Sequence, residues 1–235
     1  MILNFPQIEL NKNNALIFTA YLPSLYEHLP SLSEPLSIQE KTQAKKFINS
    51  YLRERYIISH GLLRYLLAFY AKSNPHTIEY SFNQFGKPFL KNNSSNLQFN
   101  MSHSKDYAAY ILALDCQVGI DIEQKDKNID IQGLLDLILT KEEAIIFNEL
   151  NSAEKLDTFY EVWTKKEAIL KALGQGLSHP MTLTQVMNVA ANNGAHYLAN
   201  NIKFYCSELT DLNGYSRAVA IAHETREFIQ INLTS

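Results

Sequence analysis

The feature that most constrains the fold of this chain is an order of elements, helices followed by strands, that occurs once in each half of its 235 residues. In the first half, Ser37-Ile38-Gln39-Glu40 has the form of a capping box and opens a helical stretch that runs, whole or broken, towards Ala71. Short stretches rich in aromatic and aliphatic residues then predict strands at 80–82, 97–100 and 107–114.

The second half repeats this order. A strand is predicted at 118–123, and helices follow from about Gly133 to Leu150 and from about Asp157 to Leu173, the latter closed by Gly174. Three more strands are predicted, at 202–208, 216–222 and 228–233. We therefore predict an α+β protein of two comparable halves, residues 1–115 and 116–235.

The composition is that of a globular protein, with 46% hydrophobic and 19% charged residues. The 21 basic and 24 acidic residues give a net charge of −3, which argues against a broad basic surface for nucleic acid. Cys116 and Cys206 form no CxxC pair, and neither a signal-peptide core nor an apolar run of membrane length is visible. We expect a cytoplasmic protein that binds neither nucleic acid nor a membrane.

Arg55 interrupts an apolar helical face. The residues that share this face at helical spacing are Ala44, Phe47, Ile48, Tyr51, Ile58, Leu62 and Leu66. A buried guanidinium without a partner is costly, so Arg55 must meet a carboxylate, backbone carbonyls or a bound anion. An internal salt bridge and an anion-binding role both meet this requirement.

Two carboxylates alternate along the predicted strand Val118-Gly119-Ile120-Asp121-Ile122-Glu123. Because side chains alternate across a strand, Asp121 and Glu123 share one face, and Gly119 is expected to leave room beside them. Such a pair forms half a site for a hard cation, although an ordinary exposed strand face has the same alternation.

The predicted helix 157–173 carries charged residues in and beside its apolar stripe. Lys166 lies inside the stripe, and Glu167 and Lys171 lie one turn apart along its edge. Taken alone, these residues are best explained by a surface ion pair between Glu167 and Lys171 and by a lysine, Lys166, whose stem passes its apolar neighbours.

Two turns present further polar groups. One predicted strand ends in Ser102-His103-Ser104, whose hydroxyls and imidazole suit an anion. Adjacent Ser and His side chains point apart on a strand, so they do not form a nucleophile and its base. The second turn, Phe85-Gly86-Lys87-Pro88, presents Lys87, and most lysines in such turns are simply solvated.

Together, four of these motifs resemble those of the 4′-phosphopantetheinyl transferases, of the long, monomeric surfactin-synthetase-activating type. They are Phe-Gly-Lys-Pro at 85–88, Phe-Asn-Met-Ser-His-Ser at 99–104, Val-Gly-Ile-Asp-Ile-Glu at 118–123 and Trp-Thr-Lys-Lys-Glu-Ala-Ile-Leu-Lys at 163–171. The resemblance implies two pseudo-symmetric α/β halves with coenzyme A bound in the cleft between them. It also implies transfer of the phosphopantetheine arm to a serine of an apo acyl, peptidyl or polyketide carrier protein, leaving adenosine 3′,5′-bisphosphate.

The resemblance also implies roles at the metal end of the site. Asp121, Glu123 and Glu167 would hold Mg²⁺ against the pyrophosphate of coenzyme A, and Lys171 would contact the reacting phosphate. Glu143 matches a further acidic position of the family, whose role the sequence leaves open.

At the nucleotide end, Arg55 and His103 would contact the 3′-phosphate, and Lys87 and Ser102 would line the same site. Family members often carry basic side chains just before the first long helix. The stretch Gln39-Glu40-Lys41-Thr42-Gln43 departs from that pattern, so the sequence does not say which of Lys41, Lys45 and Lys46 contacts a phosphate.

Electrostatics support a bound cation. Three carboxylates within ~4–5 Å would repel each other by about 3–4 kcal/mol per pair at an effective dielectric near 20, unless a cation or protons offset their charge. Mg²⁺ fits because it binds oxygen ligands and phosphates together. The serine of the carrier protein needs a base, and Glu167 is the candidate. Lys166 is expected to have an orienting or structural role, with a backbone carbonyl or Glu167 as its partner.

Two other functions compete with this one. A Mg²⁺-dependent nuclease or phosphodiesterase also combines an acidic pair with a glutamate and a lysine, but it usually needs a broad basic surface. A catalytically dead relative that only binds carrier proteins would be favoured by the loss of Asp121, Glu123, Glu167 or Lys171, and all four are present.

Overall fold

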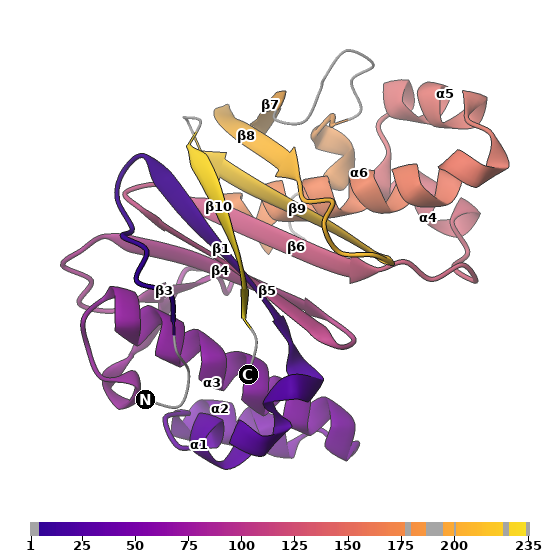
Figure 1. The fold of residues 1–235 in the computed structure, drawn as a ribbon. Helices are drawn as coiled ribbons and strands as arrows, with labels where there is room; N and C mark the ends of the chain where they lie inside the picture. The colour runs from indigo at the N-terminus through magenta and orange to yellow at the C-terminus, as the bar shows by residue number, and fades with distance from the viewer. Residues whose placement is uncertain (1–4, 177–179, 187–194, 200, 223–225, 234–235) are drawn as a thin grey trace.

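The computed structural model describes residues 5–176, 180–186, 195–199, 201–222 and 226–233, whose elements form layers of helix, sheet, sheet and helix (Figure 1). The first half contains β1 (Asn14–Tyr21), α1 (Leu29–Ser33), α2 (Ile38–Lys45), α3 (Ser50–Tyr70), β2 (Tyr80–Phe82), β3 (Pro88–Leu90), β4 (Leu97–Ser104) and β5 (Tyr107–Leu114). The second contains β6 (Val118–Gln124), α4 (Gln132–Ile138), α5 (Lys141–Glu149), α6 (Ser152–Leu173), β7 (Ala195–Ala199), β8 (Ile202–Glu208), β9 (Tyr215–Ala222) and β10 (Glu227–Leu233).

The two halves share one topology. In the first, β1 is followed by helices and then by the antiparallel pair β4–β5, and β5 returns to pair with β1. In the second, β6 is followed by helices and then by the antiparallel pair β8–β9, and β9 returns to pair with β6. The matching strand orders, β1-β5-β4 and β6-β9-β8, confirm the predicted α+β fold of two pseudo-symmetric halves.

Three apolar clusters hold the layers together. The first lies between α3 and the sheet of the first half, and the second lies between α6 and the sheet of the second half. The third joins the inner faces of the two sheets, where Ile17 and Ile111 meet Ile120 and Val219. Because β1 and β5 are buried on both faces, their sequences are continuous apolar runs without polar alternation.

Side chains at the helix ends explain where the helical segments break. The capping box of Ser37 and Glu40 begins α2 as predicted, and Asn49 begins α3 as a new helix. The single helix expected from about Gly133 to Leu150 is wrong, because Thr140 and Glu143 form a capping box that begins α5 separately from α4.

The last strand departs from the expected division of the chain at residue 115. β10 crosses back and pairs in parallel with β1, from Asn14 opposite Glu227 to Ala20 opposite Leu233. The first sheet therefore has the order β10-β1-β5-β4, and a segment from the end of the chain completes it.

Gly119 serves helix packing. A Cβ atom at this position would lie 1.9 Å from the carbonyl oxygen of Ala168 and 2.5 Å from the backbone nitrogen of Ala172, both in α6. The expectation that Gly119 leaves room for a cation is thus wrong, because α6 fills that space. The same close approach brings Glu167 and Lys171 of α6 alongside β6.

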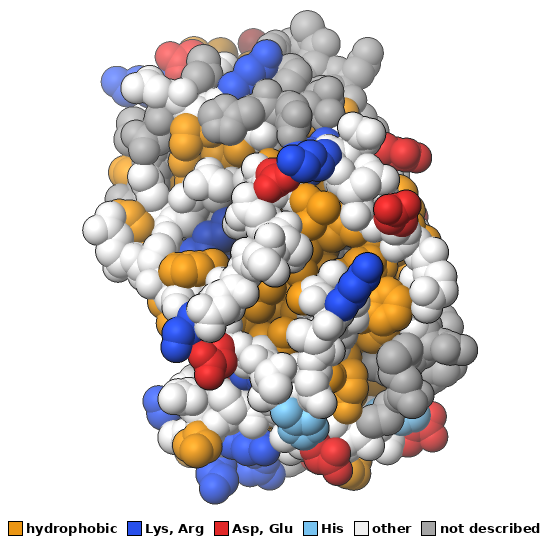
Figure 2. Space-filling model, turned by 90° about the vertical axis from the view of Figure 1, so that its left-hand side faces the viewer, with side chains coloured by type: hydrophobic (Ala, Val, Ile, Leu, Met, Phe, Trp, Pro, Cys, Tyr) orange, Lys and Arg blue, Asp and Glu red, His pale blue; other side chains and the backbone are white. Residues whose placement is uncertain are grey.

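Basic and acidic side chains lie among one another on the surface. On the face shown in Figure 2, hydrophobic side chains gather in the middle, and basic and acidic side chains are interspersed around them. No helix in the described part of the chain combines the length and apolar character needed to cross a membrane.

Candidate active site

The candidate site forms where the two sheets meet. β4 is the last strand of the first sheet and β6 is the first strand of the second, and polar side chains of β4 reach across to β6. The Ser102 hydroxyl donates to Asp121 Oδ1 at 2.9 Å, and the Ser104 hydroxyl donates to Glu123 Oε2 at 2.9 Å. Both carboxylates that the sequence singled out therefore lie at the boundary between the halves.

A pocket of about 550 Å³ opens at this boundary. Its lining comes from both halves: Phe47, Tyr56, His60, Met101, Ser102 and His103 from the first, and Asp121, Glu123, Trp163, Glu167 and Lys171 from the second. The pocket thus brings together all the predicted site residues except Arg55 and Lys87.

Asp121 and Lys171 form an ion pair in the wall of this pocket. Lys171 Nζ lies 2.5 Å from Asp121 Oδ1 and 2.9 Å from Ser102 Oγ. Asp121 is only 2% exposed, and its second oxygen, Oδ2, is buried without a hydrogen-bond partner among the described residues. A buried carboxylate oxygen without a partner is costly, so this atom marks a place for a donor or a cation.

The two glutamates of the pocket have raised pKa values. Burial and the neighbouring Asp121 raise the pKa of Glu123 to about 7, while the Ser104 hydroxyl and Lys171 act in the opposite direction. Burial and Asp121 also raise the pKa of Glu167. Burial and the Lys171 ammonium lower the pKa of His103. Burial therefore disfavours the charged forms of all three side chains, and Asp121 adds to this effect at the two glutamates.

The carboxylates of the pocket would have to move closer together to bind a divalent cation. Within the described residues, no three His, Cys, Asp or Glu side chains lie close enough to form a metal site as placed. The expected convergence of three carboxylates is therefore not found in that form, because Lys171 takes the place beside Asp121. The donor chemistry nevertheless fits Mg²⁺, since no described residue is a partner of Asp121 Oδ2 and a cation would lower the raised pKa values of Glu123 and Glu167.

Arg55 lies outside the pocket lining and has partners within the protein. Its guanidinium forms an ion pair with Asp106, donates to the carbonyl oxygen of Lys105 at 2.8 Å and to the Tyr26 hydroxyl, and lies 3.4 Å from the ring centre of Tyr51. The internal salt bridge that the sequence allowed is therefore present. The 3′-phosphate contact remains a prediction.

Lys87 is not a solvated turn lysine. Its Nζ donates to the carbonyl oxygens of Ala172 at 2.9 Å and Val118 at 3.1 Å, and burial lowers its pKa to about 8. Beside it, the Asn83 amide donates to the carbonyl oxygen of Gly174 at 2.7 Å. The turn between β2 and β3 thus satisfies free carbonyls at the C-terminal end of α6.

Glu143 and Lys166 form an ion pair that is fully buried, away from the pocket. Lys166 Nζ lies 2.5 Å from Glu143 Oε2 and donates to the carbonyl oxygen of Ile138 at 2.5 Å, while the amide of Val186 donates to Glu143 Oε1 at 2.6 Å. This confirms a backbone carbonyl as a partner of Lys166. The carboxylate beside it is that of Glu143, and the suggestion of Glu167 is wrong.

The sequence missed an aromatic wall in the pocket. Tyr56 and His60, one turn apart on α3, stack with ring centres 3.8 Å apart, and Phe47 packs on Tyr56 at 5.6 Å. Burial lowers the pKa of His60 to about 4, so its ring is neutral at physiological pH. The signal was available, because Tyr56 and His60 have helical spacing, but the pattern is equally typical of a core face.

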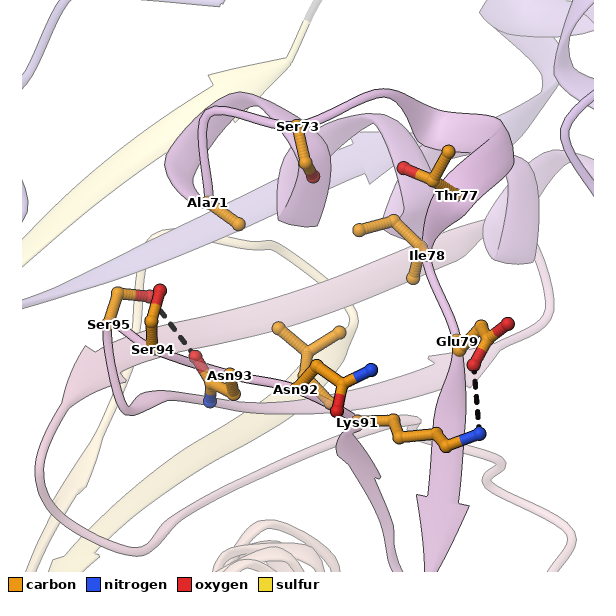
Figure 3. Close-up of a pocket in the computed structure, with 11 residues that line it drawn as sticks. Ala71, Ser73, Thr77, Ile78, Glu79, Lys91, Asn92, Asn93, Ser94 and Ser95 are labelled. Atoms are coloured by element: carbon orange, nitrogen blue, oxygen red, sulfur yellow. Dashed lines mark hydrogen bonds and ion pairs between the residues drawn. The ribbon is translucent and has the colours of Figure 1, made fainter.

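A second pocket, of about 290 Å³, lies between the end of α3 and the segment that follows β3 (Figure 3). Ser73 and Thr77 line one side, Asn93 lines another, and Glu79 and Lys91 pair with each other at 3.1 Å. None of the predicted site residues lines it, and its two charged groups neutralise one another. It is therefore the weaker candidate for a reaction centre.

Comparisons with known proteins support the pocket between the two halves. Residues 117–222 match the model of the 4′-phosphopantetheinyl transferase superfamily, and residues 22–114 match that of the 4′-phosphopantetheinyl transferase N-terminal region. The chain is 29% identical over 175 residues to 4′-phosphopantetheinyl transferase HetI of Nostoc sp., with 74% of each chain covered. It is also 29% identical over 163 residues to 4′-phosphopantetheinyl transferase Sfp of Bacillus subtilis, with 64% of this chain and 70% of the relative covered. The two matched regions carry both walls of the pocket, and the chain belongs to the 4′-phosphopantetheinyl transferase family.

Proposed function

We propose that the protein transfers the 4′-phosphopantetheine group of coenzyme A to a serine of an apo carrier protein. One observation carries this proposal: a single pocket joins Ser102 and His103 of the first half to Asp121, Glu167 and Lys171 of the second. Those residues belong to three of the motifs that identify the family. The products are the holo carrier protein and adenosine 3′,5′-bisphosphate.

Asp121, Glu123 and Glu167 are the residues that would hold Mg²⁺, since all three line the pocket. When bound, Mg²⁺ supplies positive charge that neutralises the pyrophosphate and the leaving group. The unpartnered Oδ2 of Asp121 and the raised pKa values of the two glutamates support this choice of ligands.

Glu167 and Lys171 are the proposed catalytic residues. The raised pKa of Glu167 brings it closer to physiological pH, which suits a group that accepts the proton of the carrier serine. As the hydroxyl oxygen of the carrier serine bonds to the β-phosphorus of coenzyme A, the bond from this phosphorus to the departing adenosine 3′,5′-bisphosphate breaks. The Lys171 ammonium, now held by Asp121 and Ser102, donates to the reacting phosphate and stabilises its charge.

The nucleotide end is proposed to lie near His103, which lines the pocket. Arg55 would contact the 3′-phosphate by exchanging its Asp106 partner for the ligand, because both are anions. Lys87 and Ser102 remain predicted neighbours of the nucleotide, although Lys87 is directed towards the carbonyls of Val118 and Ala172.

We also propose that the protein acts in the cytoplasm as a monomer and uses acyl, peptidyl or polyketide carrier proteins. Both walls of the pocket come from one chain, so the site needs no second copy. The net charge of −3 supports a partner other than nucleic acid.

Intact-mass spectrometry tests the proposal. Apo carrier proteins of the three classes are incubated with the enzyme, coenzyme A and Mg²⁺, and each mass is compared with that after incubation without enzyme. A gain of one phosphopantetheine group is expected, and adenosine 3′,5′-bisphosphate should appear in equal amount. Cleavage of plasmid DNA with no change in any carrier would instead favour the nuclease.

A further inference from the structure

β4 presents a row of three polar side chains to the edge of β6, at alternate positions along the strand. Asn100 Oδ1 accepts a hydrogen bond from the backbone nitrogen of Ile120 at 2.9 Å. Ser102 and Ser104 follow at two-residue spacing and bond to Asp121 and Glu123. One strand of the first half thus meets the second half at three successive points.

Ser104 makes the last of these contacts, and its hydroxyl is fixed from both sides. Its Oγ accepts from the backbone nitrogen of Gln124 at 3.1 Å and donates to Glu123 Oε2 at 2.9 Å. A hydroxyl has one hydrogen, and the incoming bond from Gln124 directs that hydrogen away from the amide and towards the carboxylate. The orientation of this hydroxyl therefore depends on the strand that carries Glu123.

From this geometry we infer that Ser104 is a positioning residue, which restricts the Glu123 side chain and keeps its carboxylate in the lining of the pocket, where a cation can reach it. Glu123 has a long side chain with three rotatable bonds, and ordering it costs conformational entropy. The hydrogen bond from Ser104 meets part of that cost before any ligand arrives. What Glu123 binds rests on the proposed function, whereas the contact between Ser104 and Glu123 does not.

Substitutions along the row separate positioning from general stability. Ser104→Ala removes the hydroxyl, and Ser104→Thr retains it. Asn100→Ala is the matched control, because Asn100 belongs to the same row but bonds to a backbone amide and to neither carboxylate. Loss of the outer partners of metal ligands typically weakens metal affinity or activity by about 10–100-fold.

The single tryptophan of the chain, Trp163, lines the pocket and can report on the cation without turnover. Mg²⁺ is titrated into the parent protein and the three variants without coenzyme A, and the fluorescence of Trp163 and the heat of binding are both recorded. Ser104→Ala is expected to bind Mg²⁺ about 10–100-fold more weakly. Ser104→Thr and Asn100→Ala should stay within about threefold of the parent.

Turnover of a carrier protein supplies the second readout. Ser104→Ala should need more Mg²⁺ for half-maximal activity, with most of kcat restored at saturating Mg²⁺, and its thermal midpoint should match that of the parent. Equal Mg²⁺ affinity in the parent and Ser104→Ala overturns the inference while leaving the proposed function intact. A parent that binds no Mg²⁺ overturns the inference and the metal site together, and a parent that binds Mg²⁺ but modifies no carrier overturns the proposed function alone.

Discussion

Lys171 Nζ lies 2.5 Å from Asp121 Oδ1, so an ammonium in the last turn of α6 is the counter-charge of a carboxylate buried in β6. The pair joins β6 and α6, the two elements that carry the proposed metal ligands and catalytic residues. It also places the lysine where a phosphate would compete with Asp121 for the same positive charge. In the free protein Lys171 neutralises Asp121, and during the reaction it is proposed to donate a hydrogen bond to the reacting phosphate.

Lys171→Ala is therefore expected to lower kcat and kcat/KM together, by about 100-fold or more, because the charge it neutralises develops at the reacting phosphate. Steady-state kinetics with coenzyme A and an apo carrier protein measure the effect. Lys171→Arg keeps the charge and should retain the thermal stability, but only part of the activity, because its planar donor group differs in shape. A rise in KM alone would remove Lys171 from the catalytic set.

The carboxylates should differ in their effect on stability. Glu123→Gln and Glu167→Gln are expected to lose most Mg²⁺-dependent transfer while keeping or slightly raising the Tm, because each removes a carboxylate whose pKa is raised by burial and by the neighbouring Asp121. Asp121→Asn should lose activity and lower the Tm, because it leaves Lys171 without its counter-charge. Calorimetry in EDTA, paired with the transfer assay, checks this order. Normal transfer by all three variants would exclude these residues as metal ligands.

The pKa of Glu123, raised from 4.5 to about 7, predicts how stability depends on pH. Between these values the folded protein binds this proton more tightly than the unfolded chain does. The contribution of Glu123 to the free energy of unfolding therefore falls as the pH rises from about 4.5 to about 7, and it is constant above that range.

Thermal unfolding in EDTA at pH 5, 6, 7 and 8 measures this contribution as the difference in Tm between the parent and Glu123→Gln. The Tm of Glu123→Gln relative to that of the parent should rise by a few degrees from pH 5 to pH 8, because each kcal/mol corresponds to roughly 2–4 °C in a chain of this size. Saturating Mg²⁺ should remove the trend in the parent. Parallel Tm profiles would show that Glu123 titrates equally in the folded and unfolded states.

The buried pair of Lys166 and Glu143 is expected to matter for stability and not for chemistry. Lys166→Met leaves Glu143 as an uncompensated buried charge, which costs about 3–5 kcal/mol and should lower the Tm by roughly 6–20 °C. Adding Glu143→Gln removes that charge and should restore part of the loss. The kcat of the folded fraction should not change, and a large fall in kcat at unchanged Tm would place Lys166 in the reaction.

Coenzyme A and dephospho-coenzyme A together test the nucleotide end. A charge-assisted hydrogen bond contributes roughly 1.5–3 kcal/mol, so His103→Ala and Arg55→Ala should each weaken the use of coenzyme A about ten- to a hundredfold. Their use of dephospho-coenzyme A, which lacks the 3′-phosphate, should change little.

Competition kinetics with coenzyme A and dephospho-coenzyme A give the ratio of their kcat/KM values directly. Asp106→Asn offers a control, because it frees Arg55 and should improve the discrimination in favour of coenzyme A. If Arg55→Ala lowers the use of both substrates equally, its ion pair with Asp106 is its whole role.

Local signals in the sequence predicted much of this fold. The capping box at Ser37 and the glycine at 174 give the start of α2 and the end of α6, because both depend on hydrogen bonds within a few residues. β1 was missed, whereas β5, which is also apolar and buried on both faces, was predicted; a short apolar run does not by itself distinguish a buried strand from a buried helical segment. The return of β10 to β1 depends on contacts across more than 200 residues, which no local pattern records.

In the site, too, some features could be predicted from the sequence and others depend on tertiary contacts. The motif residues that line the pocket were found because four motifs occur in the order typical of the family, whereas the chemistry of each motif alone did not single them out. The partners of Arg55 and Lys87 were not, because Asp106 is an ordinary turn residue and the carbonyls of Val118 and Ala172 carry no side-chain signal. Gly119 was misread because the close approach of α6 is a tertiary contact.

The position of β10 also governs the order in which the protein can be completed during synthesis. β1 leaves the ribosome early, yet its parallel neighbour is the last of the described elements to emerge. Until then β1 presents an open edge, where a strand of another nascent chain can add. The first half therefore finishes its sheet after the second half has been made, and a chain stopped before Glu227 would keep that edge exposed.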